Sequence, residues 1–328
     1  MKDLIMNAKV VFKATESHPE FYIRRISEVE IESSWKMICS TAQVVLPRNI
    51  KDFNQNKVKD WFKRGDKVEI YLCYGLDEDL ILEFSGYITQ VSADYPITIK
   101  LEDEMWRLKQ IPVNFSSKNE KLKSFVQKYV TDYPILIDAE APLGAVNIKN
   151  KTLGEVFKKF QEDLSLYPFI RNGKLVVAKP YSDVTDKIPV FDLEKNCVSN
   201  DLNYLSKEER TVKVIAESVQ NFAKTKKKLK FELGDPDPKT TINKTLSVTT
   251  LNDLQAEVRR IYDLYKKEGF DGSFTTFGTP SVQHGQKVKI TSSLYNDREG
   301  IYYIDSIKKK FSRDGYRQEI ELGPTFVK

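Results

Sequence analysis

A short phrase that occurs twice constrains the fold of this chain more than any other feature of its sequence. GDKVEI at residues 65–70 recurs as GQKVKI at residues 285–290, about 220 positions later. In both copies apolar and polar residues alternate after the glycine, which is typical of a half-buried strand entered through a turn. The sequence therefore predicts two strands of the same kind in distant parts of the chain.

The similarity continues beyond the first strand of each copy. A glycine and then a Tyr-Ile pair follow in both, and each copy ends on an alternating strand with a leucine, Leu101 or Leu322, that lies 36 or 37 positions after the first glycine. The glycines that mark the turns and bends of the repeat are Gly65, Gly86, Gly285 and Gly300. We interpret the recurrence as two copies of one small β-barrel. The alternative is that any two antiparallel meanders share such short motifs.

The first hundred residues and the residues after about 185 are rich in strand patterns, and each part also contains a helical pattern. Val58, Trp61 and Phe62 have helical spacing, so one short helix is expected beside the early strands. A longer helix is expected over 250–268, where Thr250 can act as the N-cap.

Residues 113–184 combine helices and strands. Two capping boxes, Ser117-x-x-Glu120 and Thr152-x-x-Glu155, each precede an apolar helical stripe. Asn172-Gly173 lies between two apolar runs, which is the strongest short-range signal for a β-hairpin. The predicted order is helix, strand, strand, helix, strand, strand, and this order forms a compact α+β module.

The expected fold class is therefore a β-rich α+β protein. Two tube-like antiparallel β-barrel domains, each with an accompanying helix, flank a small α+β module. The predicted domains are the first barrel at 1–112, the inserted α+β module at 113–184, and the second barrel at 185–328, which includes the helix at 250–268.

Composition restricts the function further. Lys and Arg number 52 against 47 for Asp and Glu, and this net charge of +5 is too small by itself to indicate a nucleic-acid binder. Cys39, Cys73 and Cys197 have unrelated spacings, so neither a disulfide framework nor a cysteine metal site is expected. No stretch approaches the roughly 18 uncharged apolar residues of a spanning helix, and no export signal is evident. A soluble protein without a membrane span is expected.

Residues for catalysis are few. His18 and His284 are the only histidines, and neither lies in a catalytic motif. The carboxylates at 102–104 follow a strand, where a charged run is usually a solvated turn. We therefore expect no catalytic residue, no cofactor and no metal.

The strongest charge feature is a basic run. Its members are Lys224, Lys226, Lys227, Lys228 and Lys230. One interpretation is an exposed edge strand that lysines keep soluble. The other is a surface that faces a channel or a partner and eases the passage of nucleic acid by weak, sequence-independent attraction.

The order and spacing of these motifs resemble bacteriophage tail-hub proteins of the late control gene D family. The residues that carry the resemblance at the C-terminal end are Gly278, Pro280, Gly285, Val288, Gly300, Tyr303, Gly315, Tyr316 and Ile320 to Gly323. Residues 65–110 are similar to the first barrel of such hubs, and the middle module is similar to the insertion between their two barrels. The hub part of type VI secretion spike proteins has the same design.

The resemblance implies a non-enzymatic structural hub in a phage tail baseplate or a related contractile injection machine, encoded by a phage or prophage. It implies a homotrimeric ring around a central channel, with the hexameric tail tube on one face and the spike on the other. Other baseplate proteins would be further partners, and the hub would assemble in the bacterial host cytoplasm and belong to the virion tail or the injection machine. The cargo of the lumen stays open between DNA, passing without sequence specificity, and effector protein. Since the sequence stops at Lys328, soon after the second barrel, a separate spike protein is expected.

A binding module is the alternative from another functional class. An OB-like β-barrel could hold nucleic acid or glycan on stacked aromatic side chains, for which Tyr71, Tyr74 and Tyr87 are candidates. Tyrosines in such strands more often pack on the pleated surface. A cell-wall hydrolase is a more distant third possibility.

Overall fold

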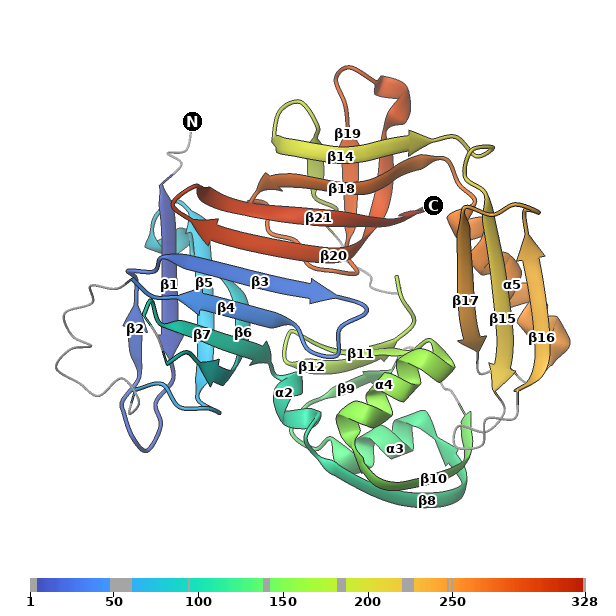
Figure 1. Ribbon diagram of the computed structural model, residues 1–328, viewed down its shortest axis with the longest axis horizontal. Helices are drawn as coiled ribbons and strands as arrows, with labels where there is room; N and C mark the ends of the chain where they lie inside the picture. The colour runs from blue at the N-terminus through green and yellow to red at the C-terminus, as the bar shows by residue number, and fades with distance from the viewer. Residues whose placement is uncertain are drawn as a thin grey trace.

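Strands dominate the architecture. The computed structural model describes residues 5–47, 61–93, 95–137, 142–181, 187–219, 227–246, 248 and 250–326. Within these residues there are four α-helices, and most strand pairs are antiparallel (Figure 1). The β-rich α+β class predicted from the sequence is confirmed.

The early strands form the first β-unit, which pairs in the order β3-β4-β7-β6-β5-β1-β2. Its strands are β1 (Met6–Phe12), β2 (Phe21–Ile23), β3 (Glu28–Ser34), β4 (Thr41–Val45), β5 (Lys67–Tyr74), β6 (Ile81–Val91) and β7 (Thr98–Asp103). A short 3-10 turn, η2 (Asp77–Asp79), connects β5 to β6. Alternating side chains such as Val68, Ile70 and Leu72 are fully buried, which gives the core that their period-two pattern predicts.

The late strands form the second β-unit in the order β14-β18-β21-β20-β19-β13. Its strands are β13 (Val190–Asp192), β14 (Cys197–Leu205), β18 (Gly269–Phe277), β19 (Lys287–Thr291), β20 (Gly300–Ser312) and β21 (Gly315–Phe326), with the 3-10 turn η3 (Asn296–Arg298) between β19 and β20. Apolar side chains from these strands form a separate core.

The two β-units belong to one sheet. Strand β20 pairs antiparallel with β3, from Ser306 opposite Ser34 to Ser312 opposite Glu28, so thirteen of the described strands are continuous. Figure 1 shows β3 and β20 side by side at the centre of the molecule. Phe311 of β20 packs in the core of the first β-unit. The closure of each β-unit into a barrel stays a prediction.

The middle module lies against the end of the first β-unit. Its elements are α2 (Met105–Leu108), β8 (Pro112–Lys121), α3 (Leu122–Tyr129), β9 (Ile135–Ile137), β10 (Pro142–Thr152), α4 (Leu153–Leu164), β11 (Tyr167–Arg171) and β12 (Lys174–Ala178). Their order from α3 to β12 is the predicted one. The Thr152 hydroxyl accepts the Glu155 N–H at 3.3 Å, as its capping box predicts. Asn172 and Gly173, with φ of 50° and 70°, connect β11 to β12 as the predicted hairpin.

The first capping box of this module is not formed. Ser117 lies inside β8, opposite Val146 of β10, and α3 begins only at Leu122 without a side-chain cap. Residues 115–117 pair with 146–148 of β10, so this segment is a strand and not the start of a helix. The prediction of a helix start at Ser117 was wrong, because cross-strand pairing overrides a local capping motif.

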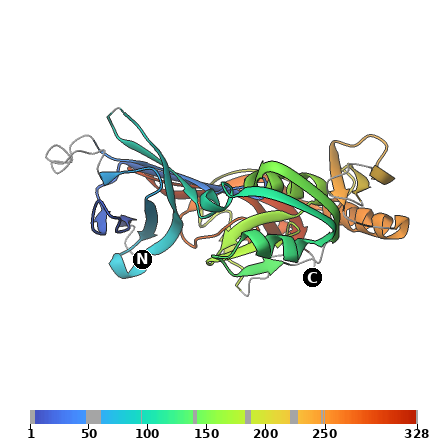
Figure 2. The same ribbon diagram turned by 90° about the horizontal axis from the view of Figure 1, so that it is seen from below.

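A fourth unit lies between β14 and β18. It contains the three-stranded sheet of β15 (Val212–Val219), β16 (Lys227–Gly234) and β17 (Thr240–Leu246), which is covered by α5 (Leu251–Tyr265). The Thr250 hydroxyl caps α5 as predicted, accepting the Asp253 N–H at 3.1 Å. Figure 2 shows this unit at one end of the long axis and the first β-unit at the other.

The place of α5 differs from the expected one. The sequence assigned the helix at 250–268 to the second barrel, but Leu254, Val258 and Ile261 pack against side chains of the β15–β17 sheet and form a core of their own. The apolar stripe identified the helix correctly but carried no information on which sheet it covers. A short helix was also expected around Val58, Trp61 and Phe62. Val58 lies outside the described residues, so this helix stays a prediction, while Phe62 packs in the core of the first β-unit.

Candidate functional site: the joint between two equivalent β-units

The two copies of the repeated phrase have the same backbone register. Lys67 of β5 lies opposite Tyr87 of β6, and Lys287 of β19 lies opposite Tyr303 of β20. Before each strand a glycine N–H donates to an isoleucine carbonyl: Gly65 to Ile88 at 2.8 Å, and Gly285 to Ile304 at 2.7 Å. The recurrence is therefore present in the hydrogen bonding as well as in the sequence.

A β-bulge follows at the same place in both copies. The pairing of β6 with β7 shifts between Ile88 and Gln90, and the pairing of β20 with β21 shifts between Ile304 and Ser306. Ile88 lies opposite Leu101, while Ile304 lies opposite Leu322, the two leucines that end the repeat in the sequence. Bulges are specific features of a sheet and rarely coincide by chance in unrelated meanders.

The four glycines of the repeat have different surroundings. Gly65 and Gly285 have φ of +96° and +81°, a conformation that side-chain-bearing residues rarely adopt. A Cβ on Gly86 would lie 2.1 Å from the Glu102 carbonyl oxygen, so the bare backbone allows β6 and β7 to approach. Gly300 begins β20. The register places Gly86 opposite Val68 of β5, whereas Gly300 lies opposite Ile290 of β19, two positions out of step with Gly86.

A buried ion pair joins the two β-units. The Lys309 ammonium of β20 donates to the Glu83 carboxylate of β6, and their side chains are 3% and 1% exposed. Ser281 donates to Glu83 at 2.9 Å and accepts from Lys309 at 2.7 Å. The Tyr316 hydroxyl donates to the second Glu83 oxygen at 2.9 Å, and burial raises its pKa well above the usual value. Such a pair is tolerated in a protein interior only when hydrogen bonds satisfy both charges.

A second contact joins the β-units beside this pair. The Tyr74 hydroxyl of β5 donates to the Tyr316 carbonyl at 2.8 Å and accepts the Tyr316 N–H at 2.9 Å. The Arg317 guanidinium also donates to the Tyr74 oxygen. The joint is thus made by backbone pairing of β3 with β20 and by a network of side chains from both β-units.

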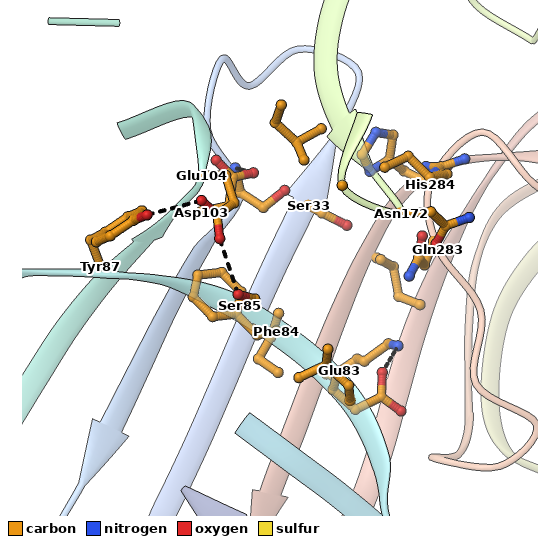
Figure 3. Close-up of a pocket in the computed structure, with 18 of the residues that line it drawn as sticks. Ser33, Glu83, Phe84, Ser85, Tyr87, Asp103, Glu104, Asn172, Gln283 and His284 are labelled. Carbon is orange, nitrogen blue, oxygen red and sulfur yellow. Dashed lines mark hydrogen bonds and ion pairs between the residues drawn. The ribbon is translucent and has the colours of Figure 1, made fainter. Parts of the chain in front are cut away.

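A cleft of about 630 Å³ opens above the ion pair, where both β-units meet the middle module. Figure 3 shows Tyr87, Asp103 and Glu104 on one side, with Asn172 and His284 on the other. The Asn172 hairpin belongs to the middle module, so three parts of the chain line this cleft.

Two adjacent carboxyl groups in the cleft have opposite pKa shifts. Burial raises the pKa of Asp103 to about 6, although the Ser40 N–H donates to its carboxylate at 2.8 Å. The pKa of Glu104 is lowered despite burial, because Tyr133 donates to it at 2.6 Å and the Lys67 ammonium lies 2.9 Å away. The predicted solvated turn at 102–104 is therefore a half-buried network.

The histidines have structural surroundings. The His284 ring packs edge-on against Trp35 and Phe169, and its burial lowers its pKa to about 3, with the Arg171 guanidinium adding to this effect. His18 Nδ1 lies 2.8 Å from the Pro19 carbonyl, and Nε2 lies 3.6 Å from Asp66.

The three candidate tyrosines of the binding-module alternative are occupied by contacts within the protein. Tyr87 is 7% exposed and stacks on Trp106, the Tyr71 hydroxyl donates to Glu69, and Tyr74 belongs to the joint. They pack on the sheet as strand tyrosines commonly do.

Only part of the basic run can be placed. Lys224 and Lys226 lie outside the described residues, and nothing is described of the side chains of Lys227 and Lys228, which lie in β16. Lys230 is exposed on β16, an edge strand of its sheet. Both interpretations of the run stay open.

The sequence did not single out Glu83 and Lys309. A signal was present: Lys309 alternates with Ile307 and Phe311 in a half-buried strand, so period two places it on the inward face. The sequence pattern does not indicate that Glu83 of β6 is its partner, because only tertiary packing brings the two strands together.

Among the residues that the structure describes, no group of three or more His, Cys, Asp or Glu side chains is arranged to hold a metal ion. No helix in the same part of the chain has the length and apolar character needed to cross a membrane.

Comparison with solved structures gives clear matches over the whole chain. A tail protein from Neisseria meningitidis has a TM-score of 0.62 at 14% identity, with 97% of this chain and 96% of that chain covered. The 43 kDa tail protein of prophage MuSo2 from Shewanella oneidensis also has a TM-score of 0.62 at 14% identity, with 96% and 98% covered. This chain has the fold of phage tail proteins.

The same fold occurs in a secretion machine. The c3393 protein of E. coli, a component of the type VI secretion system described as similar in structure to the bacteriophage T4 tail proteins gp27 and gp5, has a TM-score of 0.60 at 10% identity, with 97% of this chain and 77% of that chain covered. No protein-family model and no curated protein matches the sequence. The resemblance stated from the motifs is thus confirmed at the level of the fold.

Proposed function

We propose that this chain is a structural, non-enzymatic hub of a phage tail baseplate or a related contractile injection machine. Three copies form a ring around a central channel, with the hexameric tail tube on one face and the spike on the other. The observation that carries the proposal is the repeat: two meanders in one sheet share their register at the repeated phrase and a bulge after Ile88 and Ile304, although β20 has a further register shift between Tyr302 and Ile304. Three chains with two equivalent units each place six similar units around one axis, which matches the symmetry of a hexameric partner.

The joint supports a role that depends on rigidity. Backbone pairing of β3 with β20 and the buried pair of Lys309 with Glu83 hold the two units in one fixed relation. A ring that connects threefold to sixfold symmetry needs this relation to be the same in every copy. Ion pairs and hydrogen bonds hold Glu83 and Glu104 in the cleft, which suits a structural role, although both ring nitrogens of His284 are buried there without a hydrogen-bond partner among the described residues.

The proposal is tested by the mass and shape of the purified protein in solution. Sedimentation and negative-stain electron microscopy are expected to show rings of three chains with a central opening. Lys309→Met leaves Glu83 buried without its counter-ion and is expected to give fewer or irregular rings. The matched control, Glu83→Leu with Lys309→Met, leaves no buried charge and is expected to keep most of the rings.

The binding-module alternative gives a different result. A monomer at all concentrations that binds a single-stranded oligonucleotide, with an affinity that falls steeply with salt, would favour that alternative and contradict the hub. Rings that form equally well with and without oligonucleotide support the hub.

A further inference from the structure

Strand β14 presents a long free edge. It pairs with β18 on one side, and within the described residues no strand pairs with its other side. Residues 198–201 are exposed, and the Val198 side chain is 49% exposed. An unpaired row of backbone N–H and C=O groups is a template for another strand.

The edge of β14 has few of the features that usually prevent such pairing, and its β-bulge, between Cys197 and Ser199, lies at the start of the strand. Its sequence, CVSNDLNYL, has no lysine and no proline, and Asp201 is its single charged residue. By contrast β16, an edge strand of the β15–β17 sheet, contains Lys227, Lys228 and Lys230. Natural edge strands are commonly blocked by lysine or proline, and the sequence of β14 contains neither.

Strand β14 is the equivalent of β3 in the second β-unit. The order β3-β4-β7-β6-β5 of the first unit matches β14-β18-β21-β20-β19 of the second. The registers agree as well. In the first unit Val29 of β3 lies opposite Val44 of β4, which lies opposite Ile99 of β7. In the second unit Asn200 of β14 lies opposite Phe274 of β18, which lies opposite Ile320 of β21. Since Ile99 and Ile320 occupy the same place in the repeat, β14 should pair as β3 does.

The equivalent of the partner strand is also free. Strand β3 pairs with β20 beyond the bulge, where Ser34 lies opposite Ser306. The matching position on β6 is Gln90, the first residue after the bulge. On the side of β6 away from β7, Ile88 bonds to the backbone of Gly65 and Asp66, and no described strand pairs with residues 89–91 beyond it. Each chain thus contains one pairing of this kind, between β3 and β20. It also contains the equivalents of both partners, β14 and the end of β6, which do not pair with each other.

We propose that β14 of one copy pairs antiparallel with the end of β6 of the next copy, and that this contact repeats between chains the pairing of β3 with β20 within a chain. Transfer of the observed register places Leu205 opposite Gln90 and Tyr204 opposite Val91 of the neighbouring copy. Three such contacts close a ring of six β-units. The proposal rests on the trimeric hub proposed above and names the surface that assembles it.

Disulfide crosslinking tests the register. Leu205→Cys and Gln90→Cys are combined in a Cys197→Ser background, because Cys197 is half-buried on β14 whereas Cys39 and Cys73 are buried. Residues directly opposite each other in a sheet have Cβ atoms about 4.5–5.5 Å apart, and those two positions out of register about 7–8 Å. Mild oxidation is expected to give a covalent trimer on a non-reducing gel. The matched control, Asn203→Cys with Gln90→Cys, is two positions out of register and is expected to crosslink much less.

Blocking the edge gives a second test that does not depend on oxidation. Asn203→Lys with Gln90→Lys places like charges on exposed positions of β14 and β6 at the proposed contact, and is expected to raise the concentration needed for the ring by about tenfold or more. The melting temperature of the monomer is expected to stay unchanged, because both side chains are exposed.

The outcomes separate the two proposals. A ring of three chains that neither crosslinks at Leu205 and Gln90 nor weakens with the lysines overturns the pairing of β14 with β6 and leaves the hub standing. A chain that stays monomeric at hundreds of micromolar without a crosslink overturns both.

Discussion

Lys309 of β20 and Glu83 of β6 form an ion pair from which solvent is almost completely excluded, with side chains 3% and 1% exposed. They are 226 positions apart in the sequence, and each belongs to a different β-unit. Removal of one partner leaves a buried charge without its counter-ion, and this is more destabilising than the absence of the pair.

Lys309→Met is therefore expected to lower the free energy of unfolding by about 3–5 kcal/mol. The double variant Lys309→Met with Glu83→Leu is expected to recover most of this loss, because it leaves no buried charge. Urea denaturation followed by tryptophan fluorescence measures both. A double variant as unstable as the single one would show that the pair itself, and not the unpaired charge, supports the joint.

The two turn glycines provide a matched pair of substitutions. Gly65→Ala is expected to cost about 1–2 kcal/mol, because alanine is strained at a φ of +96° while its Cβ would lie an acceptable 3.6 Å from Trp106. Gly285→Ala is expected to cost more, because its Cβ would lie 2.5 Å from the Trp35 ring in addition to the strain at +81°. Thermal unfolding of both variants checks the order, and equal losses would contradict the contact with Trp35.

Two buried groups near the cleft have opposite effects on the pH dependence of stability. The folded protein does not protonate His284 until the pH reaches about 3, whereas the unfolded chain takes up the proton near pH 6.5, so His284 makes stability fall as the pH is lowered through this window. Asp103 keeps its proton in the folded protein up to about pH 6 and loses it near pH 4 when unfolded, so it makes stability fall as the pH is raised from 4 to 6.

Between pH 4 and 6 these two contributions offset each other. The free energy of unfolding of His284→Phe minus that of the parent is expected to become more negative as the pH rises. The change is at most about 1.4 kcal/mol per pH unit. For Asp103→Asn the same difference is expected to become more positive over this range. Denaturant unfolding at pH 4, 5 and 6 measures the differences, and a constant difference for both variants would contradict the burial of these two groups.

The basic run gives a prediction about delivery. If it faces a channel or a partner, replacement of Lys224, Lys226, Lys227, Lys228 and Lys230 by glutamate is expected to change genome delivery while ring assembly persists. Infection or injection assays together with electron microscopy of the variant measure the two separately. Loss of assembly in the variant would instead indicate a structural role for this edge.

Local patterns in the sequence determined much of the fold. Alternation identified the strands around Val68 and Ile99, and Asn172-Gly173 fixed a hairpin, because each of these signals arises from the residues that make the structure. The repeated phrase at 65–70 and 285–290 also predicted equivalent strands, which the shared register now describes in detail.

Other features depended on contacts between distant segments. Ser117 has the sequence of a helix cap but lies in β8, because β10 provides its backbone partners. The stripe of α5 predicted an apolar face, while the β15–β17 sheet decided what that face covers. The sequence by itself determined two β-units. The tertiary structure alone decided that β3 and β20 join the two β-units into one sheet beside the ion pair of Glu83 with Lys309. The reason is that these residues lie far apart in the sequence, and only folding brings them together.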